Sequence, residues 1–347
     1  MASSIYTHYP WVSRPLIANA PMADFAGARL ATSVTMAGGL GFIGSAMNAG
    51  ALSTELEKAK SLLSSSQIAI SSTLPIGVGF LIFAEKLENV VAVIAQHRPA
   101  VIWLSCPPES QDFAIWAKAM RTASPESRIW IQISGVAAAV EVAQLCAPDV
   151  LVLQAADAGG HGRSPGAGLV SLIPESRDEL DAAGFSKIPV IGAGGVGDGR
   201  GVAAALACGA DGVLMGTAFL ASIEVDLPAK EYQEAILEAV DGGVNTVRGT
   251  IFDDIRAKII WPTRYDGRAL TSPSYQDYLD GVGLHELKKK YADSITGSDK
   301  GFGGERRAVI WAGSAVGLVK EVKAAGDIVR ELRETSKAAF DRACSKF

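Results

Sequence analysis

Short apolar runs alternate with longer segments of helical spacing along the first two thirds of the chain. Apolar runs separated by helices are typical of strands in a parallel sheet, buried on both faces. The runs predict eight strands, at Leu16–Ala20, Leu40–Gly44, Ile76–Phe80, Val101–Leu104, Ile129–Ile133, Val150–Leu153, Val190–Ala193 and Gly212–Met215. The segments between them predict helices at Ala26–Ala37, Ser53–Leu63, Ala84–His97, Ser110–Arg121, Val136–Cys146, Glu175–Ala183 and Gly199–Cys208.

Eight strand–helix units in series predict an α/β fold, the closed TIM or (β/α)8 barrel. A doubly wound, Rossmann-like sheet is the alternative, and the number of units favours the barrel. Residues 223–310 break the rhythm, because they are more charged and more helical in pattern. We therefore predict a barrel made of residues 1–222 and 311–347, with residues 223–310 as an added helical segment over its mouth. A final helix is expected from Ala315 to Ala343.

The composition of the chain argues against several classes of function and partner. The chain has 347 residues, a formal net charge of −5 and no basic stripe, which argues against a nucleic-acid partner. Its four cysteines form no CxxC pair and lie away from the histidines, so we expect reduced thiols and no metal site. With no secretory pattern and no apolar run of membrane-spanning length, a cytoplasmic protein is expected. The oligomeric state stays open, with a homodimer as one option.

A histidine flanked by glycines follows the sixth predicted strand. In a TIM barrel the loops after the strands meet at the carboxyl end, where active sites form. Of the four histidines only His161 lies in such a loop, and imidazole is a base near neutral pH. We predict that His161 is catalytic. A loop histidine that only hydrogen-bonds its neighbours is the alternative.

Two more glycine-rich segments follow the seventh and eighth predicted strands. TIM barrels commonly hold a phosphate group there, with backbone N–H groups and a helix N-terminus. Gly194 and Gly195 would offer bare N–H groups, while Gly216 and Thr217 would add an N–H and a hydroxyl. The P-loop pattern is not matched, because no GK[ST] follows the glycines. The pair of loops therefore predicts a phosphate site.

Five motifs, in this order, resemble the nitronate monooxygenase family, formerly called 2-nitropropane dioxygenase. They are APM at Ala20–Met22, AGGLG at Ala37–Gly41, QxxDAGGHG at Gln154–Gly162, GAGGVGDGR at Gly192–Arg200 and GADGVLMGTAF at Gly209–Phe219. The resemblance spans about residues 15–220, with a weaker match at Trp311–Ser314. It implies an FMN-dependent TIM barrel whose catalytic histidine, in the AGGH motif, is His161.

The resemblance also implies which residues surround the flavin. The ring would be lined by Ala20, Pro21 and Met22, reached at its polar edge by Gln154 and passed by Gly159 and Gly160. The phosphate would be held by Gly194, Gly195, Gly216 and Thr217, and Gln132 is a weaker candidate for the ring or ribitol.

Two positions depart from the family pattern. Gly79 stands where many members have Asn, which puts one flavin or substrate contact in doubt, and Asp157 stands where many have Glu, a mild change.

The resemblance implies oxidation of alkyl nitronates by O2 to a carbonyl compound and nitrite. If a neutral nitroalkane is accepted, His161 is the candidate base for its α-proton. Related activities of the same superfamily are the alternatives: NAD(P)H-dependent quinone reductase and enoyl reductase. A flavin-free, phosphate-binding barrel lyase or isomerase and a flavin-binding protein without activity are further alternatives.

Overall fold

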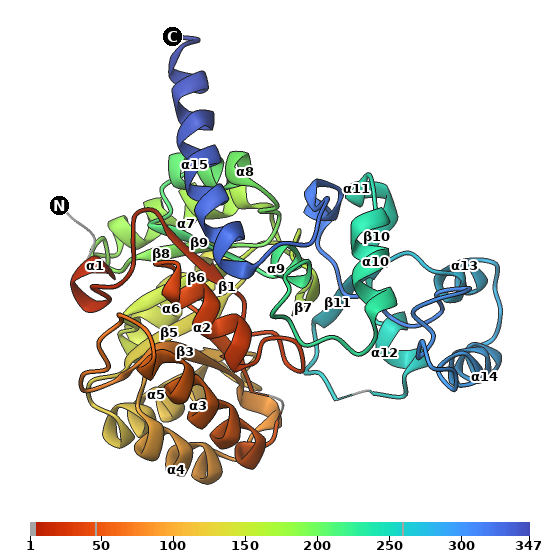
Figure 1. Ribbon diagram of the computed structural model, residues 1–347, viewed down its shortest axis with the longest axis horizontal. Helices are drawn as coiled ribbons and strands as arrows, with labels where there is room; N and C mark the ends of the chain where they lie inside the picture. Colours follow the sequence, from red (N-terminus) through yellow and green to blue (C-terminus); the bar gives the residue numbers. More distant parts are fainter. Residues whose placement is uncertain (1–4, 46, 259) are drawn as a thin grey trace.

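Eight parallel strands form the barrel in the computed structural model, which describes residues 5–45, 47–258 and 260–347 (Figure 1). They pair in the order β1-β9-β8-β6-β5-β4-β3-β2. The predicted TIM barrel is therefore confirmed, and each predicted strand overlaps an observed one. The strands are β1 (Leu16–Asn19), β2 (Phe42–Gly44), β3 (Leu74–Leu81), β4 (Pro99–Ser105), β5 (Arg128–Ile133), β6 (Val150–Gln154), β8 (Val190–Ala193) and β9 (Gly212–Met215).

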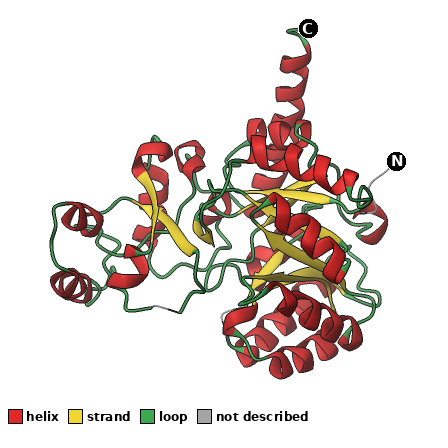
Figure 2. Cartoon of the chain, turned by 180° about the vertical axis from the view of Figure 1, so that it is seen from behind, coloured by secondary structure: helices red, strands yellow, loops and turns green. Residues whose placement is uncertain are grey.

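Helices surround these strands, as Figure 2 shows from behind. They are α2 (Ala28–Met36), α3 (Ala49–Ser64), α4 (Leu87–His97), α5 (Ser110–Ala123), α6 (Val136–Cys146), α7 (Leu169–Ala182) and α8 (Gly199–Ala207), with the short η1 (Ile82–Ala84) and α9 (Thr217–Leu220). The prediction was wrong about the start of α7, which begins before Pro174 rather than after it. Burial of Leu172 and Ile173 in the core stabilises that first turn in spite of the proline.

The side chain of Asn19 joins the two strands at which the barrel closes. Within the described residues, the backbones of β1 and of the chain before β2 pair through an isolated parallel bridge between Ala18 and Leu40. Fully buried Asn19 continues the ladder: its Oδ1 accepts from the N–H of Phe42 at 2.9 Å, and its Nδ2 donates to the Phe42 carbonyl at 2.8 Å. The amide therefore supplies the hydrogen bonds that a longer β2 would supply.

The amino-terminal segment fills the other end of the barrel. α1 (Ile5–His8) leads into Tyr9, whose buried hydroxyl accepts a hydrogen bond from the Trp130 indole at 2.9 Å. Tyr9 and Trp130 belong to an interior cluster with Phe42 and Trp103. This packed aromatic core leaves the carboxyl end of the strands as the end that can form a site.

The added region contains an antiparallel sheet that the prediction of a helical segment missed. β11 (Tyr265–Leu270) pairs with β10 (Thr246–Gly249) and with β7 (Gly160–Arg163), which is the segment of His161. His161 thus lies in a strand, not in a loop as predicted. The helices of this region are α10 (Lys230–Glu238), α11 (Gly242–Asn245), α12 (Ile251–Ile255), α13 (Pro273–Leu279) and α14 (Leu284–Ser294), and they lie to one side of the barrel (Figure 1).

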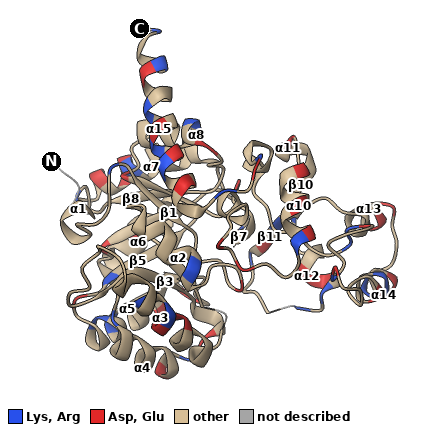
Figure 3. Cartoon of the chain, in the orientation of Figure 1, with Lys and Arg blue, Asp and Glu red and all other residues tan. Residues whose placement is uncertain are grey.

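The last helix starts later than predicted. α15 (Ala325–Cys344) packs against α8 and α2. Residues 315–324, which were predicted to belong to this helix, contain most of the 3-10 turn η2 (Ser314–Leu318) but no α-helix. Lys323 instead forms a parallel bridge with Ser222. Among the described residues no helix is long and apolar enough to cross a membrane. Figure 3 shows acidic and basic side chains interspersed over the face in view.

We predict that Asn19→Ala lowers the free energy of unfolding by about 2–4 kcal/mol, because it leaves the buried N–H and carbonyl of Phe42 unpaired. Urea denaturation followed by circular dichroism measures the change. The control is Asn48→Ala, which removes only an exposed helix cap and should cost about 1 kcal/mol. Equal losses in the two variants would contradict the role given to Asn19.

Candidate active site

His161 extends from β7 into a gap that a glycine keeps open. Its partner in the antiparallel pairing is Gly267 on β11. A Cβ at position 267 would lie 2.3 Å from a ring carbon of Trp311 and 3.4 Å from the Nε2 of His161. Only glycine therefore lets the imidazole and this indole share the space. Gly160, in the left-handed region at φ +70°, turns the chain from the barrel into β7.

Three side chains surround the imidazole of His161. Nε2 lies 2.8 Å from Oδ2 of Asp253, and the two side chains are only 10% and 9% exposed. The ring of Trp261 stacks on the imidazole at 3.7 Å between centroids and 11° between planes, and Trp311 lies at 4.6 Å and 56°. The histidine is thus held between aromatic rings with a carboxylate at one nitrogen.

Burial lowers the pKa of His161 below its ordinary value. The hydrogen bond and the charge of Asp253 act in the opposite direction, while the positive charges of Arg256 and Arg248 lower the pKa further. The net lowering keeps the imidazole neutral at pH 7. A neutral imidazole has a lone pair that can take a proton.

A chain of amides runs from the barrel to His161. Gln132, on β5, donates through Nε2 to Oε1 of Gln154 at 3.0 Å, and Gln154 donates through Nε2 to the His161 carbonyl at 3.1 Å. The structure thus places Gln132 and Gln154 together, with the Gln154 amide directed at the backbone of the histidine. A Cβ at Gly162 would lie 2.7 Å from Oε1 of Gln154, so a side chain there would displace the Gln154 amide.

Two arginines of the added sheet bind β7 and the segment that precedes it. Arg248 donates to the carbonyl of Gly162 at 3.0 Å and forms an ion pair with Asp266. Arg268 donates to the carbonyl of Ala156 at 3.2 Å. Because both acceptors lie on the chain that carries His161, these charge-assisted bonds orient the histidine from outside the barrel.

The glycine turn after β8 packs against the segment before His161. Gly194 and Gly195 adopt left-handed φ values of +94° and +74°. A Cβ at Gly194 would lie 2.8 Å from the Ala158 nitrogen, and one at Gly195 would lie 3.0 Å from the Cβ of Asp157. These backbones are in contact, and side chains at both positions are excluded.

The turn after β9 contacts Gly313 at the carboxyl-end rim of the barrel, where the turn after β8 also lies. Thr217 accepts a hydrogen bond from the Gly313 N–H at 2.9 Å, and Ser314 donates its N–H to the Asp157 carbonyl at 3.0 Å. A Cβ at Gly159 would lie 2.4 Å from the Gly313 nitrogen. The strand ends that carry the predicted phosphate residues therefore converge beside the AGGH segment.

This rim fits a phosphate group. Within the described part of the chain, the N–H groups of Gly194, Gly195, Gly216 and Thr217 have no hydrogen-bond acceptor. The hydroxyl of Thr217 accepts from Gly313, so its proton remains available to donate. Backbone N–H groups gathered in a concave turn bind anions well.

Ala20, Pro21 and Met22 follow β1 on the same rim. A Cβ at Gly216 would lie 3.7 Å from that of Ala20 and 3.6 Å from the Met22 sulfur, which places the APM motif next to the Gly216 turn. A Cβ at Gly79 would lie 2.4 Å from the Pro21 ring. Pro21 therefore occupies the space that a side chain at position 79 would need, which accounts for glycine at this departure from the family pattern.

Comparison with known proteins identifies the family. A family model described as nitronate monooxygenase matches residues 10–335. The chain belongs to the nitronate monooxygenase family. It is 44% identical to nitronate monooxygenase npaC of Metarhizium robertsii, over 95% of this chain and 93% of that protein. It is 38% identical to a nitronate monooxygenase of Neurospora crassa, over 95% of this chain and 91% of that one. In fold it is similar to FabK of Thermotoga maritima, with a TM-score of 0.76, 22% identity and full coverage of both chains.

The sequence motifs did not predict Asp253, Trp261 and Arg256, which lie around the histidine of this family member. All three lie in or after α12, in the added region, where no motif was recognised. Arg256 lies over the Trp311 ring at 5.5 Å. The pairing of β7 with β11 returns this region to His161, but the glycines and arginines of these strands obscure any strand pattern in the sequence.

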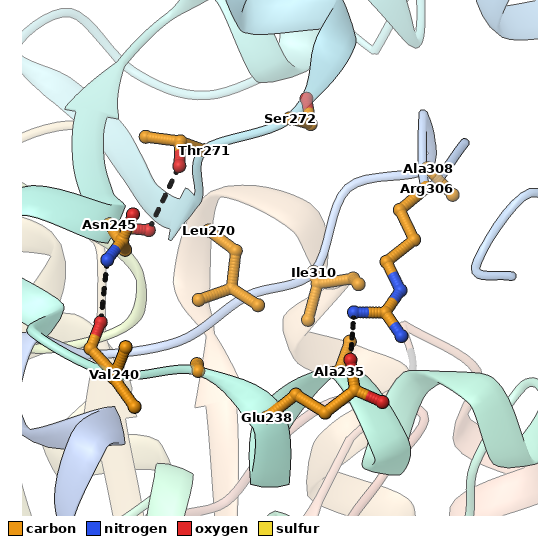
Figure 4. A pocket seen from close by; sticks show the side chains of 11 residues that line it. Ala235, Glu238, Val240, Asn245, Leu270, Thr271, Ser272, Arg306, Ala308 and Ile310 are labelled. Atoms are coloured by element: carbon orange, nitrogen blue, oxygen red, sulfur yellow. Dashed lines mark hydrogen bonds and ion pairs between the residues drawn. The ribbon is translucent and has the colours of Figure 1, made fainter. Parts of the chain in front are cut away.

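Two cavities, of about 290 and 430 Å3, open elsewhere in the added region. In the first, Leu270 and Ile310 form an apolar floor beside the ion pair of Arg306 with Glu238 at 2.6 Å (Figure 4). Neither cavity is lined by His161 or by a predicted flavin residue. The chemistry of the site therefore lies at the barrel rim and not in these cavities.

We predict that Gly194→Ala destabilises the protein by about 2 kcal/mol or more, because it adds a backbone clash to the strain of a left-handed alanine. Gly184→Ala is the matched control. Gly184 has a similar φ of +85° but open space around it, so strain alone should cost about 1 kcal/mol. Thermal denaturation compares the two, and an equal loss would contradict close packing at the rim.

Proposed function

We propose that this protein binds FMN at the glycine rim and oxidises alkyl nitronates with O2, giving a carbonyl compound and nitrite. The observation that carries the proposal is the aromatic-walled His161, paired with Asp253 beside converging glycine turns, in a chain of the nitronate monooxygenase family. FabK, the similar solved structure, supports the barrel and not the substrate.

The residues of the rim fit a flavin mononucleotide. FMN would supply the redox chemistry, and the protein would bind it, orient it and shield it. The bare N–H groups of Gly194, Gly195 and Gly216, with the Thr217 hydroxyl, match the needs of the phosphate. For the ring we propose Ala20, Pro21, Met22, Gln132, Gln154, Gly159 and Gly160, which lie on the same rim.

His161 has a role only for neutral substrates. A nitronate already carries the negative charge, so its oxidation needs no base. A nitroalkane must first lose its α-proton, and the neutral imidazole of His161 can take it. Trp261 and Trp311 hold the imidazole ring in place for this step.

We propose a division of labour between the two parts of the chain. Residues 1–222 and 311–347 would carry the flavin, and residues 223–310 would cover it and contact the substrate. Support comes from Arg248 and Arg268, which bind the AGGH segment from the added sheet.

The proposed function is tested by reconstitution with FMN followed by assay. The purified protein should be yellow, should consume O2 with ethylnitronate and should release nitrite. Absence of flavin binding after addition of FMN would overturn the cofactor. Rapid anaerobic bleaching by NADH or NADPH, without nitrite formation from nitronates, would overturn the reaction in favour of a reductase.

We further predict the pH dependence of kcat/KM for nitroethane. The pKa of His161 is lowered, so the imidazole is still mainly neutral at pH 6.5, where an ordinary histidine would be half protonated. The rate should therefore fall only below that pH. Stopped-flow or oxygen-electrode assays across pH measure the profile, with ethylnitronate as the substrate that bypasses the base.

His161→Asn should lower nitroethane turnover by about 10²-fold or more and spare ethylnitronate. An equal loss with both substrates would contradict a role as base.

A further inference from the structure

We propose that Asp253 is a positioning residue for His161, holding the Nε2–H tautomer and leaving Nδ1 as the atom that takes the substrate proton. The inference rests on the proposed function for its catalytic consequence. The pairing of the two side chains can be tested without it.

The geometry of the pair fixes which nitrogen carries the proton. Oδ2 of Asp253 lies 2.8 Å from Nε2 of His161, and a carboxylate only accepts, so neutral His161 must donate from Nε2. Among the described residues Nδ1 has no hydrogen-bond partner, so its lone pair is free. The stacking of Trp261 and the contact with Trp311 hold the ring in this orientation.

Asp253 is placed for this task at a cost to stability. It is 7% exposed, and its Oδ1 is buried without a partner among the described residues. An unsatisfied buried carboxylate oxygen is destabilising, so packing alone does not account for it. The short helix α12 fixes its backbone, since the Asp253 N–H donates to the Thr250 carbonyl at 2.9 Å.

The charges that face His161 come from three places. Asp253 stands on α12, Arg256 follows that helix and Arg248 stands on β10. Asp253 is the one that favours the imidazolium, whereas both arginines oppose it. Without Asp253 a buried histidine would face two positive charges alone and would be a weaker base.

The step is a proton transfer. The α C–H bond of the nitroalkane breaks, its electron pair moves into the nitro group to form the nitronate, and the proton binds Nδ1 of His161. The imidazolium then donates from Nε2 to Asp253, and the two opposite charges stabilise each other.

The first experiment reads the tautomer directly by ¹⁵N NMR of the histidine rings. With only four histidines in the chain, His161→Gln assigns the signal. In the wild type we expect a protonated Nε2 and an unprotonated Nδ1 above the pKa. In Asp253→Asn the pKa of His161 should fall further, because the charge that favours the imidazolium is lost. Asp254→Asn, on the same helix and outside the pair, should leave it unchanged.

The second experiment separates positioning from folding. In Asp253→Asn, kcat/KM for nitroethane should fall by about 10- to 100-fold and its acidic limb should move to lower pH, while turnover of ethylnitronate is retained. If Asp253→Asn does not fold, Asp253→Glu and the wild-type tautomer carry the test.

Three results would overturn the inference: an Nδ1–H tautomer in the wild type, an unshifted His161 pKa in folded Asp253→Asn, or equal losses with nitroethane and ethylnitronate. Failure of the proposed function has a different signature. In that case the wild type would not oxidise ethylnitronate at all, and the NMR result on the pair would stand by itself.

Discussion

Close contact between backbones at the rim of the barrel is the constraint on which the rest of the site depends. Gly159 packs so closely on Gly313 that a Cβ would lie 2.4 Å from its nitrogen, and Gly194 packs in the same way on Ala158. These contacts bring together chain segments far apart in sequence. Because the N–H groups of Gly194, Gly195, Gly216 and Thr217 have no acceptor among the described residues, the rim presents donors to an anion.

The added region depends on the same contact. After the barrel strands end, the chain leaves through α10 to α14 and returns at Gly313, where Thr217 and Asp157 bind it. Between these points β11 pairs with β7, so the strand that carries His161 belongs to the barrel by sequence and to the added sheet by hydrogen bonding. The position of the histidine is therefore set by both parts of the chain.

Because β7 joins the two parts of the chain, local sequence patterns predicted the barrel but not the surroundings of His161. The barrel strands are local apolar runs, and Val190–Ala193 and Gly212–Met215 were predicted to the residue. The AGGH histidine and the glycine turns could be named as candidates because each follows a predicted strand in the sequence. β7, Asp253 and Trp261 were not predictable, because their roles arise from pairing across about a hundred residues, and glycine-rich strands have little periodicity.

The charged groups around His161 have an energetic cost in common. Three groups each lower stability when considered alone: buried Asp253 with an unpaired oxygen, half-buried Arg268 with its pKa lowered by burial and by Arg248, and an imidazole with a lowered pKa. Two of the positive charges are compensated by hydrogen bonds, because Arg248 binds the carbonyl of Gly162 and Arg268 binds that of Ala156. A core chosen only for stability would place apolar residues there. The retention of charge beside an aromatic-walled histidine is therefore better explained by proton transfer than by folding.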